Sequence, residues 1–158
     1  KIVFDEIDYK KINSFTIDEH RVEEFKDKIN RLWINDSKAT NVDATIKALV
    51  PYLNQKIYLI LGGDDKGADL KPLFHSIKDL DIKIFSIGSN MDRIKNYCKD
   101  FNISYNESKN LNNAIIEIHK NHTQNSVAIL SPAASSLDQF SSYIDRGKEF
   151  KKLVNLLS

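Results

Sequence analysis

The pattern of apolar and polar positions predicts short strands separated by helices. Segments rich in branched and apolar residues are expected to form strands at residues 32–35, 57–61, 83–87, 103–105 and 127–130. Helical periodicity predicts helices at residues 42–49, 70–80, 91–99, 111–122 and 137–157. Because strands alternate with helices, we expect right-handed crossovers and a largely parallel sheet covered on both faces.

The N-terminal part departs from this alternation. Residues 22–26 are predicted to pair with residues 32–35 as a hairpin, which adds an antiparallel edge strand. Residues 1–20 are expected to contain a short helix near residues 6–12 and an extended segment leading into the domain. The fold class is therefore α/β: a Rossmann-like, three-layer domain with a mostly parallel sheet and an antiparallel edge strand near the N-terminus.

Length and charge narrow the classes of function. A chain of 158 residues fits one domain, and its 23 basic and 22 acidic residues nearly cancel. This balance gives no support for a nucleic-acid or membrane-surface partner, and no apolar run is long enough to cross a bilayer. Because the chain starts at Lys1 and not at methionine, we expect a piece of a longer protein.

Cysteine and histidine offer little chemistry. The single cysteine, Cys98, excludes an internal disulfide and is expected on a helix, facing the core. The four histidines are too scattered for a metal site and are expected at surface positions of helices: His20, His75, His119 and His122.

Polar residues gather in a loop that follows the first strand of the parallel part. Residues 35–41 place Asp36, Lys38 and Thr40 between a strand and a helix. Helix capping by Thr40 or Asn41 explains one or two of these residues, but it leaves Asp36 and Lys38 unexplained. Ligands of open α/β sheets collect at the carboxyl ends of the strands, so this loop is a candidate binding site.

Two further loops have the same position relative to their strands. Gly62 and Gly63 permit positive φ and a close approach of the backbone to a ligand, and Lys66 favours an anion site. Neither a phosphate loop nor a dinucleotide-binding pattern is present there. Residues 131–140 lead into the helix predicted from residue 137, whose free N–H groups suit a carboxylate or phosphate. Capping by Ser135 or Ser136 alone is the structural alternative.

Together, the three loops resemble a known family. The sequences NDSKATN at 35–41, GGDDKG at 62–67 and SPAASSLDQF at 131–140, preceded by His20-Arg21, resemble the C-terminal domain of the Mur ligases. The resemblance extends from this His-Arg pair to about residue 150. The third motif, followed by Arg146-Gly147, is similar to the branch that accepts D-glutamate.

The resemblance implies an ATP-dependent ligase that adds D-glutamate to UDP-N-acetylmuramoyl-L-alanine through an acyl phosphate. Such an enzyme is expected to be a cytoplasmic monomer that acts in peptidoglycan synthesis, and hence in cell wall biogenesis, cell shape and cell division. Residues 1–20 would be the tail of the central ATPase domain and a linker, and residues 21–158 the amino-acid-binding domain. ATP and Mg²⁺ would be bound mainly by other domains, so this chain alone is expected to be inactive.

The resemblance also implies roles for individual residues. The nucleotide would contact Arg21 at its phosphates and Asp36 at its ribose, with Lys38 on the same loop. One carboxylate of D-glutamate would bind Thr40 and Lys66. The other would bind Ser136, the backbone of Leu137, and Tyr143. It implies no catalytic side chain and no metal ligand within this chain.

Two alternatives stay open. Another Mur ligase or a folylpolyglutamate synthase would share this architecture, although the segment SLDQF favours D-glutamate. A non-catalytic Rossmann-like binding module is the alternative from a different class, and the missing glycine fingerprint argues against it.

Overall fold

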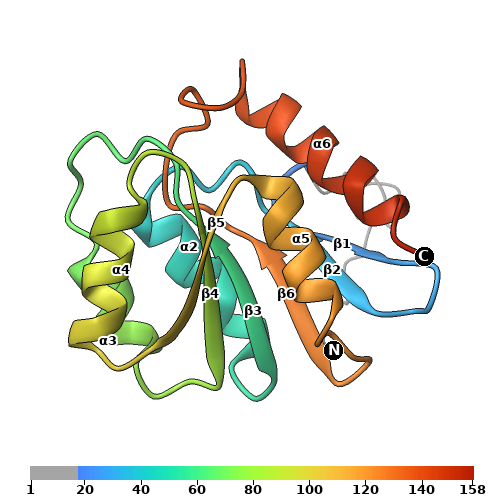
Figure 1. Ribbon diagram of the computed structural model, residues 1–158, viewed down its shortest axis with the longest axis horizontal. Coiled ribbons are helices and arrows are strands. Elements are labelled where there is room, and N and C mark those ends of the chain that lie inside the picture. The colour runs from blue at the N-terminus through green and yellow to red at the C-terminus, as the bar shows by residue number, and fades with distance from the viewer. Residues whose placement is uncertain (1–17) are drawn as a thin grey trace, which may run out of the picture.

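A six-stranded sheet forms the centre of the protein, in a computed structural model that describes residues 18–158 (Figure 1). Its strands are β1 (Glu23–Lys26), β2 (Leu32–Asn35), β3 (Lys56–Leu61), β4 (Ile82–Ile87), β5 (Ser104–Lys109) and β6 (Ser126–Leu130). The order is β1-β2-β6-β3-β4-β5, and every pair is parallel except β1 with β2. The predicted fold class is confirmed. The helix predicted near residues 6–12 lies outside the described residues.

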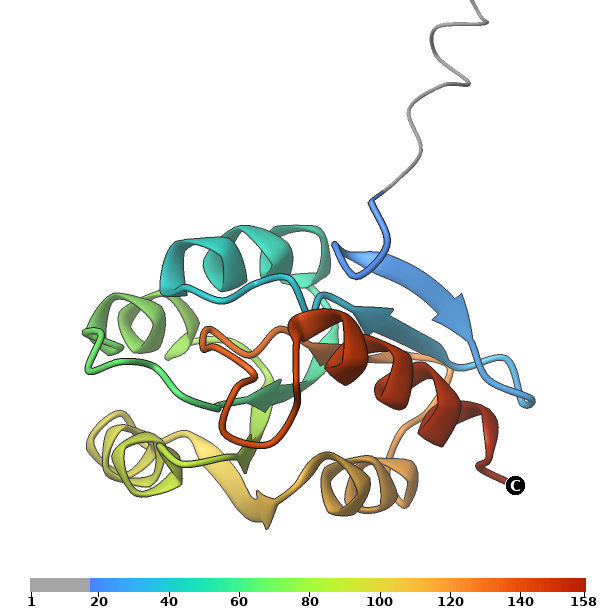
Figure 2. The ribbon, with the colours of Figure 1, turned by 90° about the horizontal axis from the view of Figure 1, so that it is seen from above.

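Helices cover both faces of this sheet (Figure 2). They are α2 (Val42–Leu49), α3 (Lys71–Ile77), α4 (Met91–Asp100), α5 (Leu111–His119) and α6 (Tyr143–Asn155), with a 3₁₀ turn at Val50–Tyr52. Because side chains alternate along a strand, Ile57 and Leu59 pack under α2, α3 and α4, whereas Tyr58 and Ile60 pack under α5 and α6. Within residues 18–158, no helix combines the length and the apolar character needed to cross a membrane.

Local signals account for several element boundaries. α2 begins after Asn41, whose side chain accepts a hydrogen bond from the Ala44 amide at 2.9 Å, as the capping pattern predicts. Cys98 is buried on α4, which confirms its predicted place, and burial raises the pKa of its thiol to about 12. The boundaries of β2 and α2 match the predicted ones.

The start of the last helix was predicted wrongly. α6 begins at Tyr143, and its N-cap is Ser142, whose hydroxyl accepts a hydrogen bond from the Asp145 amide at 3.1 Å. Asp138, expected in the first turn of this helix, instead accepts a hydrogen bond from the Ser89 amide at 2.8 Å. Residues 137–142 are therefore a loop held by a contact that is distant in sequence.

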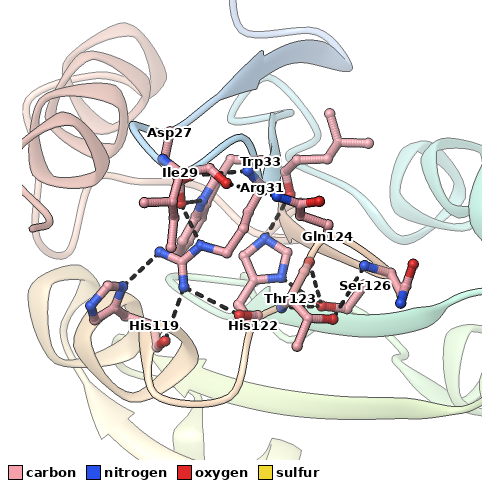
Figure 3. Close-up of polar contacts among 11 residues, drawn as sticks. Asp27, Ile29, Arg31, Trp33, His119, His122, Thr123, Gln124 and Ser126 are labelled. Atoms are coloured by element: carbon pink, nitrogen blue, oxygen red, sulfur yellow. Dashed lines mark hydrogen bonds and ion pairs between the residues drawn. The ribbon is translucent and has the colours of Figure 1, made fainter.

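A buried polar network lies at the amino ends of β2 and β6 (Figure 3). Arg31 pairs with Asp27 at 2.7 Å, and its Nη1 donates to the carbonyl oxygens of His119 and His122. Asp27 also accepts a hydrogen bond from Trp33 Nε1 at 2.8 Å. His122 is buried here, so its predicted surface position was wrong. The ring can be buried because both of its nitrogens have hydrogen-bond partners in the network. Among the other histidines, His119 is half-buried and His75 is exposed.

The stability of the domain is expected to depend on the charge of His122. Its Nε2 donates to the Leu32 carbonyl oxygen at 2.9 Å, and its Nδ1 lies 2.6 Å from the Ser126 hydroxyl, which can donate to it when the ring is neutral. Burial, with Arg31 and His119 nearby, lowers the pKa of His122 from 6.5 to about 4, although Asp27 and the bond to Leu32 oppose this shift. Between these values the unfolded chain binds the additional proton. The contribution of neutral His122 to the free energy of unfolding is therefore fully present above pH 6.5. It is lost as the pH falls towards 4, at up to about 1.4 kcal/mol per pH unit.

Urea unfolding at several pH values, followed by the fluorescence of the single tryptophan, Trp33, measures this slope. His122→Gln removes the titrating group and keeps an amide donor. The free energy of unfolding of the variant should therefore depend less steeply on pH between 6.5 and 4, by an amount that corresponds to about one bound proton. Equal slopes for the two proteins would contradict a neutral, buried His122.

Candidate functional site

The loops after β2, β3 and β6 lie together at one end of the sheet (Figure 1). Backbone hydrogen bonds join them: the Asp36 amide donates to the Leu130 carbonyl at 2.8 Å, and the Gly62 amide donates to the Pro132 carbonyl at 2.9 Å. Figure 2 looks onto this end and shows the orange-red loop of residues 131–142 beside the loop that follows β2. The three predicted loops thus form one continuous surface.

A pocket of about 520 Å³ opens beside the loop after β2. It is lined by five of the eight predicted site residues: Arg21, Asp36, Lys38, Thr40 and Tyr143. Its other lining residues are Val22 and several residues of the loop and of α2: Ala39, Asn41, Asp43, Ala44, Lys47 and Ala48. The residues predicted for the nucleotide, together with two of those predicted for the amino acid, therefore share one cavity.

Two hydrogen bonds fix the carboxylate of Asp36 in this pocket. It is buried, its Oδ1 accepts from the Val22 amide at 3.1 Å, and its Oδ2 accepts from the Ser131 hydroxyl at 2.6 Å. Burial raises the pKa of the Asp36 carboxyl, and these two hydrogen bonds partly oppose the shift. Each carboxylate oxygen has a second lone pair, so Asp36 can accept a further hydrogen bond from a ligand hydroxyl.

The charges around the pocket suit a phosphorylated ligand. Arg21, Lys38 and Lys47 line it, and Lys38 contacts Asp18 at 3.3 Å while Lys47 pairs with Asp43 at 2.8 Å. Cations suit phosphate groups, and a carboxylate such as Asp36 suits the hydroxyls of a ribose. Among residues 18–158, no group of three His, Cys, Asp or Glu residues is arranged to hold a metal ion.

Lys66 lies on the second loop, outside the pocket. Its side chain is exposed, its backbone φ is 52°, and its amide donates to Asp64 Oδ1 at 3.1 Å. Asp64 and Ser135 exchange backbone hydrogen bonds of 3.0 and 2.8 Å. This bridge fixes the loop of Lys66 against the third loop, beside Ser136.

The two glycines of the second loop are required by packing between loops. A Cβ atom at Gly62 would lie 2.2 Å from the carbonyl oxygen of Ile87, and one at Gly63 would lie 2.4 Å from that of Ser135. Both residues also have positive φ. The glycine pair was expected to let the backbone approach a ligand closely. In the structure it lets the backbone of this loop approach the backbone at Ile87 and Ser135.

The third loop differs from its prediction. Ser136 is buried, and its carbonyl accepts hydrogen bonds from the amides of Gln139 and Phe140, which closes a single turn. The Leu137 side chain is 64% exposed, and its amide donates to Ser135 Oγ at 3.3 Å. The expected helix N-terminus at this point was wrong, since α6 starts six residues later. Neither residue lines the pocket.

Sequence reasoning missed the place of His20. It is buried, not at the surface, and its Nδ1 lies 2.8 Å from Asn35 Nδ2, so Nδ1 acts as the acceptor. A Cβ atom at Gly147 would lie 2.1 Å from His20 Nδ1, so this glycine makes room for the ring. The His-Arg pair is thereby held against α6, which places Arg21 at the pocket. A glycine inside a predicted helix was the available signal.

Arg146 is a further residue whose place in the site was not predicted. Its guanidinium is buried beneath the loops, and Nε donates to Ser37 Oγ at 2.9 Å. Its Nη2 donates to the Ser37 carbonyl at 2.6 Å, and Nη1 to the Ala134 carbonyl at 3.1 Å. Ser37 Oγ in turn donates to the Tyr143 carbonyl at 2.7 Å.

No family model matches the chain. A Helicobacter pylori protein named UDP-N-acetylmuramoylalanine–D-glutamate ligase is 51% identical over 145 residues, which cover 92% of this chain and 34% of that protein. The protein of the same name from Campylobacter jejuni is 46% identical over 155 residues, which cover 98% of this chain and 39% of that protein. The chain belongs to the Mur ligase family. It spans roughly a third of the length of these curated relatives and corresponds to their C-terminal domain.

Solved structures agree with this Mur ligase fold. The folylpolyglutamate synthase of Thermotoga maritima superposes with a TM-score of 0.60 at 13% identity, covering 97% of this chain and 34% of that protein. The UDP-N-acetylmuramate–alanine ligase of the same organism superposes with a TM-score of 0.53 at 16% identity, covering 85% of this chain and 29% of that protein. A MurF ligase from Thermotoga maritima, in complex with ADP, superposes with a TM-score of 0.52 at 13% identity, covering 89% of this chain and 31% of that protein. At these identities the likeness concerns the fold alone.

Proposed function

We propose that this domain is the acceptor-binding part of an ATP-dependent ligase that adds D-glutamate to UDP-N-acetylmuramoyl-L-alanine. The observation that carries this proposal is the 46–51% identity, over nearly the whole chain, to relatives that bear the name of such a ligase. Residues 21–158 would form the amino-acid-binding domain, and residues 1–20 the connection to a central ATPase domain.

The pocket beside α2 would receive the nucleotide. Its cations, Arg21 and Lys38, would contact the phosphates, and Asp36 would accept a hydrogen bond from a ribose hydroxyl. ATP supplies the phosphoryl group that activates the carboxylate of the UDP-muramoyl substrate. Mg²⁺ would be held mainly by other domains.

The acceptor would lie between the loops after β2, β3 and β6. Thr40 and Lys66 would bind one carboxylate of D-glutamate, and Ser136, the Leu137 backbone and Tyr143 would bind the other. Because no helix N-terminus lies at Ser136, Lys66 would supply most of the positive charge for a dianionic amino acid. The amino group of the acceptor then attacks the acyl phosphate, an amide bond forms, and inorganic phosphate leaves.

Acceptor-dependent ADP release by the full-length protein tests this function. With UDP-N-acetylmuramoyl-L-alanine present, D-glutamate should be preferred over L-lysine and diaminopimelate. Preference for another amino acid would overturn the assigned acceptor. Absence of acceptor-dependent ATP cleavage would overturn the ligase itself and favour a non-catalytic binding module.

A further inference from the structure

Arg146 is buried without a carboxylate partner of its own. The side chain is 1% exposed, and its three hydrogen-bond acceptors, described above, are all neutral oxygens. None of the ion pairs among residues 18–158 includes Arg146. Burial lowers the pKa of its guanidinium to about 10, and the charge of Asp138 only partly offsets this. A cation placed in this way costs stability and needs an explanation other than stability.

The acceptors of Arg146 lie on two loops and on no strand or helix. Two of them belong to Ser37, next to Asp36 in the loop after β2, and the third is the Ala134 carbonyl in the loop after β6. The residue after Ala134 is Ser135, which is bridged to Asp64 in the loop of Lys66. The guanidinium thus contacts two of the loops that the proposed function uses, and the Ser135–Asp64 bridge joins the third loop to one of them.

We propose that Arg146 is a positioning residue that fixes the nucleotide-side loop and the two acceptor-side loops relative to one another. This inference rests on the proposed function. The rigid, forked guanidinium holds Ser37 and Ala134 at once, and lysine can replace it only in part because one ammonium group has no such fork. Misplacement of these loops separates groups that must act together on the acceptor and the nucleotide.

Arg31 offers a matched control. It is also buried and also donates to backbone carbonyls, but it pairs with Asp27 (Figure 3). It lies near the amino ends of β2 and β6, at the opposite end of the sheet. Replacing either arginine by methionine removes a buried guanidinium and keeps most of the side-chain volume. A purely structural role of Arg146 would therefore give both variants the same kinetic behaviour.

Steady-state kinetics of the full-length protein provides the first test. Arg146→Met should raise the KM for D-glutamate on the order of tenfold to a hundredfold and the KM for ATP by a smaller factor. The KM for the UDP-muramoyl substrate should stay within about twofold, because other domains would bind it. Arg146→Lys should lie in between, and Arg31→Met should lower the amount of active enzyme at unchanged KM values. Equal KM values in Arg146→Met and the parent would overturn the proposal.

Hydrogen exchange in the same full-length variants tests the link between the loops without any substrate. Arg146→Met should speed exchange in both residues 36–41 and residues 131–142, whereas Arg31→Met should speed it near residues 119–126. Faster exchange confined to α6 would overturn the positioning role. If the parent protein does not use D-glutamate, the proposed function fails, and exchange still decides whether Arg146 connects the loops.

Discussion

Replacing Asp36 by alanine is expected to lower the free energy of unfolding by about 2–4 kcal/mol, because one partly buried and one buried donor then lose their acceptor. These donors are the Val22 amide and the Ser131 hydroxyl, at 3.1 and 2.6 Å. The same change removes the carboxylate that we assign to the ribose, so the KM for ATP of the full-length protein should rise on the order of tenfold. Asp36→Asn keeps one acceptor oxygen and should have a smaller effect on both quantities.

Asp43 is a control for this prediction, because it lines the same pocket with the same charge. Its side chain is 74% exposed and pairs with Lys47, which is also exposed. Asp43→Ala should change the free energy of unfolding by less than about 0.5 kcal/mol. Urea unfolding followed by Trp33 fluorescence, together with ATP titrations of the full-length variants, measures both effects. Equal losses for Asp36→Ala and Asp43→Ala would contradict the role of the buried carboxylate.

Lys66→Ala should raise the KM for D-glutamate by about 10- to 100-fold, since a charge-assisted hydrogen bond contributes about 1.5–3 kcal/mol. Lys66 is exposed, on a loop whose backbone is fixed by Asp64 and Asp65. Alanine retains the Cβ atom, so the positive φ at this position is no more strained in the variant than in the parent. The free energy of unfolding should therefore change little, and the KM for ATP should be nearly unaffected.

Lys71→Ala is the matched variant, because Lys71 is an exposed lysine at the start of α3, close along the chain. It should leave the KM for D-glutamate within about twofold, since an exposed charge outside the site is screened by solvent and salt. Initial-rate measurements over a range of D-glutamate concentrations compare the two variants. An unchanged KM in Lys66→Ala would remove this lysine from the acceptor site.

Much of the fold follows from short-range patterns, and its departures have long-range causes. The boundaries of α2 were predictable because Asn41 and Pro51 mark its two ends locally. Residues 136–138 look like a helix start, but Asp138 is engaged by Ser89 from a separate loop. Strand β5 was predicted too short, because its exposed polar residues at the edge of the sheet hide the strand pattern.

In the site, too, some features follow from local sequence patterns and others from long-range contacts. Loops at the carboxyl ends of parallel strands had to lie close together, so the contact between the loops after β2, β3 and β6 was predictable. The burial of His20 against Gly147, and of Arg146 under two loops, depends on where α6 crosses the sheet. No periodicity in a single sequence contains that information. The assignment of individual side chains to D-glutamate stays a prediction.

The buried thiol of Cys98 makes this domain suitable for site-specific labelling. With the pKa of this thiol raised to about 12, maleimides should modify it slowly while the domain is folded. A cysteine introduced at Leu137, whose side chain is 64% exposed, would then be the reactive thiol of this domain. A fluorophore attached there would sit beside the third loop. Energy transfer from it would report how far that loop moves when substrates bind to the full-length protein.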